Sequence, residues 1–199
     1  HCISSAASDV YKRQRLHRTA QMKQALLVID VQRALFDVVP RPHEGHVVVD
    51  RINALSRRAR AAGVPVIWIQ HEDSRSLPFE SDGWQLAQGV EVAAPDLRIR
   101  KRTPDSFLNT GLGELLAERK IGSIVVAGYA SEFCVDTTVR RAAALGYPVV
   151  IASDAHTTHD KPHATGEQIR AHHNATLPGI TSFGPKIEAV RSEEIVWAD

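Results

Sequence analysis

The amino-acid sequence predicts an α/β fold: a doubly wound, Rossmann-like three-layer sandwich around a central, mostly parallel six-stranded sheet. Two observations predict it. From Met22 onwards short apolar runs alternate with helical patterns, and the runs are apolar throughout rather than at every second residue. Such strands are typical of parallel sheets whose two faces are both covered by helices. Right-handed crossovers then favour an order in which the first and fourth strands are adjacent at the centre.

The strands follow in order along the chain. The apolar runs that predict them lie at residues 25–30, 64–69, 97–100, 123–127, 148–153 and 180–183. Pro65 stands near the start of the second run, where a missing backbone N–H is tolerated. The third run is weak because arginines alternate with its two apolar residues. The sixth run, Ile-Thr-Ser-Phe, is short, and its β-branched and aromatic residues are the reason to predict a strand there.

Helices are expected between these strands. Their patterns lie at residues 47–62, 112–120, 135–145 and 161–175. The first has its apolar residues on one stripe, and Gly63 ends it. Residues 71–97 are rich in Pro, Gly, Ser and charges and predict a long loop, which in a compact domain is usually functional.

Composition favours one globular domain. The chain has 199 residues, of which 43% are hydrophobic, and no apolar run is long enough to span a membrane. We expect the domain at residues 22–199. Cys2 and Cys134 are the two cysteines, and their positions do not suggest a structural disulfide. A reducing, cytoplasmic location fits this usage.

The first 21 residues are expected to be a disordered or non-native tail. They lack apolar periodicity, and Met22, the one methionine, directly precedes the first strand as the expected native start. The tail carries a net charge of +3 and the whole chain +1, so residues 22–199 carry −2. The basic character belongs to the tail, and it gives no argument for nucleic-acid binding.

The segment Ala127-Gly-Tyr-Ala-Ser-Glu-Phe-Cys134-Val-Asp-Thr-Thr138 is the most informative stretch. It places a cysteine after a buried strand and at the start of a helix. The positive end of the helix dipole favours thiolate over thiol, and the thiolate is the nucleophile. Asp30 ends the first strand, so the predicted topology brings its carboxylate close to Cys134 at the switch point of the sheet.

Three pieces then occur in order: Leu27-Val-Ile-Asp30-Val-Gln32, Arg100-Lys101-Arg-Thr-Pro-Asp105-Ser-Phe107 and Gly128-Tyr-Ala-Ser-Glu-Phe-Cys134-Val. This trio resembles the isochorismatase-like cysteine hydrolase superfamily, which includes nicotinamidases and N-carbamoylsarcosine amidohydrolases. The resemblance covers nearly all of residues 22–184. Each piece alone is weak, whereas the ordered set is specific.

The resemblance implies a catalytic triad of Asp30, Lys101 and Cys134. It also implies a non-proline cis peptide at Tyr129–Ala130 and an oxyanion hole formed by the backbone amides of Ala130 and Cys134. The expected activity is hydrolysis of a small amide or related C–N bond through a thioester. No metal or other cofactor is needed for any step. The family resemblance further suggests a homodimer or homotetramer.

Other residues are expected near the strand ends and could line a substrate pocket: Phe36, Gln70, His71, Trp84, Phe107 and Tyr129. They would suit a small, partly aromatic or planar substrate. Trp84 and Phe107 could equally belong to the core.

Each candidate has a structural alternative. Asp30 could cap a turn, Lys101 could belong to a solvated basic run, and Cys134 could be an inert buried thiol. Cys134 to Arg140 fits the Cys-x5-Arg spacing of cysteine phosphatases. The intervening residues contain no glycine, carry an acid and look helical, which argues against a phosphate loop.

The histidines suggest a metal site only by spacing. His156, His159 and His163 are spaced like ligands, but we expect a loop with incidental histidines. Some relatives bind a metal through an Asp-x-His motif after the first strand, and the stretch here, Pro40-Arg-Pro-His43-Glu-Gly45, lacks it. This departure weakens nicotinamidase as the specific activity.

Two further functions stay open. One is vinyl ether hydrolysis of the isochorismatase type, which does not require a cysteine. The other is a non-catalytic protein on the same fold that binds a ligand or senses thiol oxidation. A lone Cys134 without a resolving cysteine makes such a sensor less complete.

Overall fold

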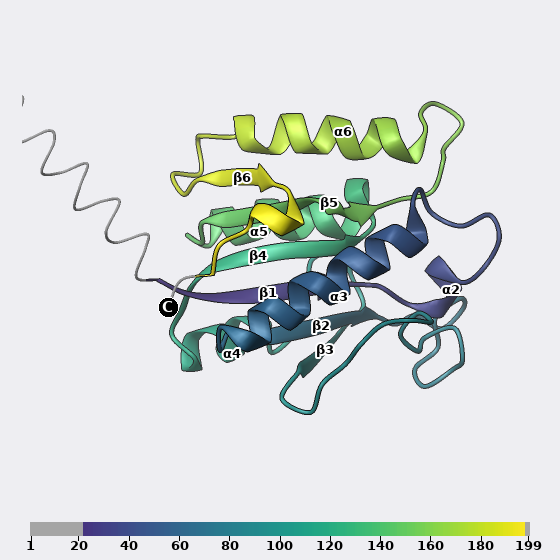
Figure 1. Ribbon diagram of the computed structural model, residues 1–199, viewed down its shortest axis with the longest axis horizontal. Coiled ribbons are helices and arrows are strands. Elements are labelled where there is room, and N and C mark those ends of the chain that lie inside the picture. The colour runs from purple at the N-terminus through teal and green to yellow at the C-terminus, as the bar shows by residue number, and fades with distance from the viewer. Residues whose placement is uncertain (1–21, 198–199) are drawn as a thin grey trace, which may run out of the picture.

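A computed structural model describes residues 22–197, which form a six-stranded sheet between layers of helices (Figure 1). The order across the sheet is β3-β2-β1-β4-β5-β6, and every neighbouring pair is parallel. The predicted doubly wound sheet, with its first and fourth strands adjacent at the centre, is confirmed. The predicted tail lies outside the described residues. The strands are β1 (Lys23–Ile29), β2 (Val66–His71), β3 (Leu97–Lys101), β4 (Ile121–Tyr129), β5 (Val149–Thr157) and β6 (Ile187–Val190).

Helices cover both faces of the sheet. One face packs against α3 and the other against α4 and α5. In Figure 1, α3 crosses in front of the central strands. Among the described residues, no helix is long and apolar enough to cross a membrane. The helices are α2 (Arg33–Phe36), α3 (Gly45–Ala61), α4 (Leu112–Glu118), α5 (Asp136–Ala144) and α6 (Gly166–Thr176).

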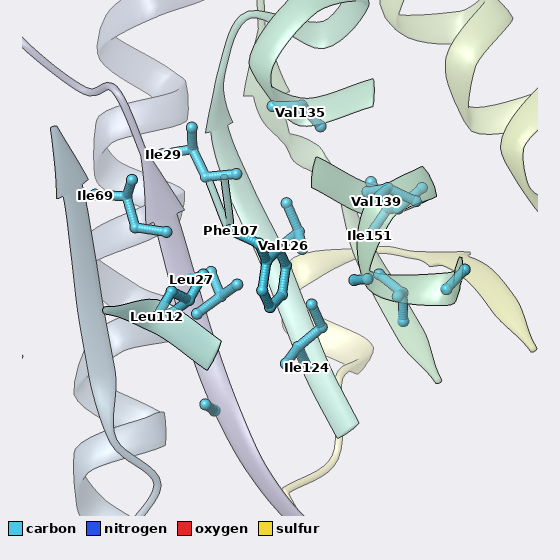
Figure 2. Close-up of a cluster of buried hydrophobic side chains, with 14 of the residues drawn as sticks. Leu27, Ile29, Ile69, Phe107, Leu112, Ile124, Val126, Val135, Val139 and Ile151 are labelled. Atoms are coloured by element: carbon cyan, nitrogen blue, oxygen red, sulfur yellow. The ribbon is translucent and has the colours of Figure 1, made fainter. Parts of the chain in front are cut away.

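The core explains why the strands read as unbroken apolar runs. Successive residues of β1 alternate between the two faces, so Leu27 and Ile29 pack under α4 and α5 while Leu26 and Val28 pack under α3. All four are buried. Figure 2 shows the first of these two clusters around the central strands. Burying each such side chain contributes about 1.5–3 kcal/mol.

The sixth strand was predicted in the wrong place. Residues 180–183 follow a 3-10 turn, Leu177–Gly179, and form a turn of their own in which the Gly184 N–H donates to the Thr181 carbonyl. The strand is instead β6, which pairs in parallel with β5. Only Ile187 among its four residues is buried, so this edge strand has little apolar pattern.

Helix starts also differ from the prediction. The fourth helix begins at Gly166, not near residue 161, because Thr165 caps it: the Thr165 hydroxyl accepts from the Gln168 N–H, and the Gln168 side chain accepts from the Thr165 N–H. The helix that was predicted over 135–145 is preceded by a π-helical turn, Ser131–Val135, and becomes α-helical at Asp136.

The strand β3 forms one edge of the sheet. Its burial alternates, so Arg98 and Arg100 are exposed while Lys101, the last residue, is buried. The long loop predicted over 71–97 joins β2 to β3 and crosses to β1 through an antiparallel bridge between Gln32 and Leu86. The carboxyl ends of β1, β2, β3 and β4 therefore meet at one end of the sheet.

Candidate active site

Three predicted side chains meet at these carboxyl ends. Asp30 directly follows β1, Lys101 ends β3, and Cys134 lies in the π-helical turn after β4. The Lys101 ammonium donates to Asp30 Oδ2 at 2.7 Å and to Cys134 Sγ at 3.2 Å. Asp30 and Lys101 are each 2% exposed, and Cys134 is partly buried. One ammonium therefore links a carboxylate to a thiol away from bulk water.

The backbone at this point is specialised on two adjacent strands. Asp30 adopts a left-handed conformation with φ of 52°, which is uncommon for a residue with a side chain. On β4, Gly128 pairs with Ile29 and has φ of +118°, and a Cβ there would lie 2.1 Å from the Ile29 carbonyl oxygen. Only glycine allows β4 to approach the end of β1 this closely. The glycine in Ala127-Gly128-Tyr129 is thus a requirement of the site.

The thiol is protonated in this environment. Burial and the Asp30 carboxylate raise the pKa of Cys134 to about 12, although Lys101 opposes them. The helix-dipole argument predicted the opposite shift, and that prediction is wrong because burial and the Asp30 carboxylate both favour the neutral thiol. Burial acts to lower the pKa of Lys101, but the negative charge of Asp30 and the hydrogen bonds of the ammonium to Asp30 and Cys134 outweigh it and the pKa is raised.

Lys101 has two further neighbours. Its ammonium donates to the Thr103 carbonyl at 3.2 Å and lies 3.4 Å from His71 Nδ1. Burial, together with the charge of Lys101, lowers the pKa of His71, so the imidazole beside the triad is neutral at pH 7. Of the pocket residues predicted from the sequence, His71 is the one in direct reach of this ammonium.

The loop between β2 and β3 is held beside the site by hydrogen bonds to the Trp84 carbonyl. The side chains of Gln70 and Gln32 both donate to the Trp84 carbonyl at 2.9 Å. Gln32 also donates to the His71 carbonyl and accepts from the His71 N–H. Gln32 was quoted in the first motif but was not predicted as a site residue. Its full burial next to Asp30 is set by tertiary contacts that the sequence pattern does not reveal.

The aromatic candidates separate into two groups. Phe36 packs edge-on against Tyr129, with ring centroids 5.8 Å apart, beside the turn that carries Cys134. Phe107 lies in the core cluster and stacks on Tyr147 at 6.1 Å, and Trp84 is buried edge-on against Phe79. The core alternative that the sequence left open for Trp84 and Phe107 accounts for their packing.

The turn between β4 and Cys134 has an unusual backbone. The Tyr129–Ala130 peptide bond is cis. Ala130 is buried, and its carbonyl accepts from the Phe133 and Val135 N–H groups within the π-helical turn. The two amides that the family resemblance assigns to an oxyanion hole, those of Ala130 and Cys134, therefore belong to one tightly bonded turn.

The predicted histidine loop is partly a strand. His156 lies inside β5 and is fully buried, which corrects the expectation of a loop residue, while His159 and His163 follow the strand. Within residues 22–197, no group of three or more His, Cys, Asp or Glu side chains is arranged to hold a metal ion. His156 and His159 instead contact Ser131 and Tyr129, on either side of Ala130.

Comparison with known proteins assigns the fold to a family. Residues 24–177 match the isochorismatase domain. The chain belongs to the isochorismatase family. A solved structure described as an isochorismatase family protein superposes with a TM-score of 0.76 at 34% identity, covering 84% of this chain and 97% of the other.

Curated relatives in the isochorismatase family include named hydrolases. Streptothricin hydrolase of Streptomyces noursei is 37% identical over 177 residues, which is 88% of this chain and 64% of the relative. A second streptothricin hydrolase from the same organism is 39% identical over 71% of this chain and 52% of its own length. The chain thus spans about half to two thirds of these relatives. Ureidoacrylate amidohydrolase RutB of Klebsiella pneumoniae is 29% identical, covering 82% of this chain and 84% of the relative.

Proposed function

We propose that this protein is a cysteine hydrolase that cleaves a small amide or related C–N bond through a thioester on Cys134. The observation that carries the proposal is the Lys101 ammonium placed between Asp30 Oδ2 and Cys134 Sγ. The relatives named as amidohydrolase and streptothricin hydrolase support hydrolysis as the reaction class.

The first step is attack by sulfur on the carbonyl carbon. Because the pKa of Cys134 is raised to about 12, the thiol needs a base at the moment of attack. Asp30 is that base: its Oδ1 is buried and has no hydrogen-bond partner among the described residues. As the S–C bond forms, the thiol proton moves to Asp30 and the negative charge on the carbonyl oxygen is stabilised by the Ala130 and Cys134 amides.

The remaining steps return the enzyme to its starting state. Asp30 gives its proton to the leaving nitrogen as the C–N bond breaks, which leaves a thioester. Asp30 then takes a proton from a water molecule whose oxygen attacks the thioester carbon. The acid is released, and the proton returns from Asp30 to the Cys134 sulfur. Lys101 remains protonated throughout and offsets the negative charge that moves from the Asp30 carboxylate to the tetrahedral intermediate and back.

The two other functions have less support. A redox-sensing thiol needs a lowered pKa and a resolving cysteine, whereas the pKa of Cys134 is raised and Cys2 is the one other cysteine in the sequence. Vinyl ether hydrolysis would give the thiol no role, although Cys134 lies within hydrogen-bond distance of Lys101.

The test is ammonia release from a panel of small amides, ureido acids and nicotinamide. We expect release by the wild type from at least one class, and its loss in Cys134→Ala. Cys2→Ala is the matched control and should keep wild-type rates. Release that persists in Cys134→Ala would exclude the thioester route. Mass spectrometry of the wild type mixed with a turned-over substrate should show an acyl adduct on Cys134.

A further inference from the structure

Two buried or partly buried histidines contact the residues on either side of Ala130. Ser131 Oγ lies 2.8 Å from His156 Nδ1, and Tyr129 Oη lies 2.7 Å from His159 Nδ1. The histidines come from β5 and the segment after it, whereas Tyr129, the last residue of β4, and Ser131 flank Ala130, whose peptide bond to Tyr129 is cis. The residue before Ala130 and the residue after it are thus each held by a histidine side chain.

The direction of the first contact follows from its neighbours. Asn174 donates through Nδ2 to the Ser153 carbonyl at 2.8 Å, so its Oδ1 faces His156 Nε2, also at 2.8 Å. An amide oxygen only accepts, so His156 carries its proton on Nε2. Nδ1 is then an acceptor, and the Ser131 hydroxyl must donate to it. Each hydrogen bond from Ser131 through His156 to Asn174 therefore has a defined donor and acceptor.

The second contact joins two side chains that can each donate or accept. A neutral imidazole has one N–H and one acceptor nitrogen, so His159 Nδ1 pairs with the Tyr129 hydroxyl in either tautomer. Burial lowers the pKa of both histidines, to about 4 for His156, which keeps the rings neutral.

We propose that His156 and His159 are positioning residues that hold the Ala130 amide in its oxyanion-binding orientation through Ser131 and Tyr129. This inference rests on the proposed function, because it concerns the residues that position the oxyanion hole of that reaction. The two histidines approach the turn from β5 and from the segment after it, and the Asn174 contact anchors His156 to α6. A small rotation of the Ala130 peptide would remove its donor from the developing oxyanion while leaving Cys134 in place.

The test compares two reactions of the same thiol. Acylation of Cys134 by p-nitrophenyl acetate creates an oxyanion on the acetyl carbonyl, whereas alkylation by iodoacetamide is a displacement at carbon that creates none. The ratio of the two rates therefore reports the oxyanion hole and not the thiol. Neither probe depends on knowing the amide substrate, so the test remains readable if no amide in the panel is hydrolysed.

We expect Ser131→Ala, Tyr129→Phe and His156→Gln each to lower the ratio about tenfold or more, a part of the 100- to 1,000-fold effect of losing an oxyanion donor outright. Ser131→Thr keeps the hydroxyl and should restore the ratio. Ser106→Ala is the matched control, because it removes one buried hydroxyl contact, to Thr138 of α5, away from Ala130.

Two outcomes would overturn the proposal. In one, the ratio is unchanged in all three variants. In the other, acylation and alkylation fall together, which would mean that the histidines merely support the folded turn that carries Cys134. Failure of the wild type to release ammonia from any amide, with the ratio still lowered in the three variants, would count against the proposed substrate class and not against this positioning role.

Discussion

Lys101 and Asp30 form an ion pair at 2.7 Å in which both side chains are almost completely closed to solvent. Removing one partner of such a pair leaves an uncompensated buried charge, which costs about 3–5 kcal/mol. We therefore expect Lys101→Met to lower the free energy of unfolding by that amount in urea titrations. The loss of activity in this variant then has a structural component.

The double variant Asp30→Asn, Lys101→Met separates the two effects. It removes both charges, so it should recover much of the lost stability while remaining inactive. A double variant as unstable as Lys101→Met alone would show that packing of the lysine stem, and not its charge, holds the site together.

Gly128 provides a second prediction, with a matched control in Gly146. Gly128→Ala should fail to fold or lose more than about 3 kcal/mol, because its Cβ would lie 2.1 Å from the Ile29 carbonyl oxygen. Gly146 also has positive φ, +97°, but a Cβ there meets nothing within 4 Å, so Gly146→Ala should cost only about 1 kcal/mol. Thermal unfolding of the two variants checks the contrast, and equal losses would contradict it.

Iodoacetamide should alkylate the Cys134 thiol slowly at neutral pH and faster as the pH rises. With the Cys134 pKa raised to about 12, the thiolate fraction grows about tenfold per pH unit between pH 7 and 9. Iodoacetamide rates should therefore climb across that range without a plateau. Asp30→Asn removes a cause of the raised pKa, so it should speed alkylation at pH 8 while abolishing turnover. A plateau below pH 8 in the wild type would contradict the protonated thiol.

His156 should make the folded state sensitive to acid. Burial lowers its pKa from 6.5 to about 4 in the folded state, so between those values the unfolded chain binds a proton that the folded chain does not. Stability therefore falls as pH drops from 6.5 to 4, by about 3 kcal/mol from this group alone. Urea midpoints of the wild type and His156→Gln should converge over this range. His172→Gln, at an exposed position of α6, should keep the wild-type slope.

The sequence predicted the sheet well because parallel strands buried on both faces need apolar residues at every position, as Leu26 to Ile29 show. The same topology correctly brought Asp30 and Cys134 together. The place of β6 was not predictable, because an edge strand with one buried residue has no such pattern. The protonated Cys134 thiol and the role of Gln32 depend on how deeply each side chain is buried, which is a property of the assembled fold.

His156 was misplaced for a different reason. Beyond Val126↔Ile151, the register between β4 and β5 shifts, and Gly128 pairs with His156. Two steps along β4 thus match five along β5, so the histidine reaches the turn that carries Cys134 only because of this irregularity. No periodicity in the sequence marks it.

The exposed arginines of β3 have a consequence for the protein in concentrated solution. This strand is one of the two edges of the sheet, and an edge strand presents backbone groups that can pair with the edge of another molecule. Arg98 and Arg100 are exposed on this strand, and charged side chains on an edge strand disfavour pairing with the edge of another molecule. The charged side chains of β3 thereby disfavour edge-to-edge association at the strand that ends in Lys101.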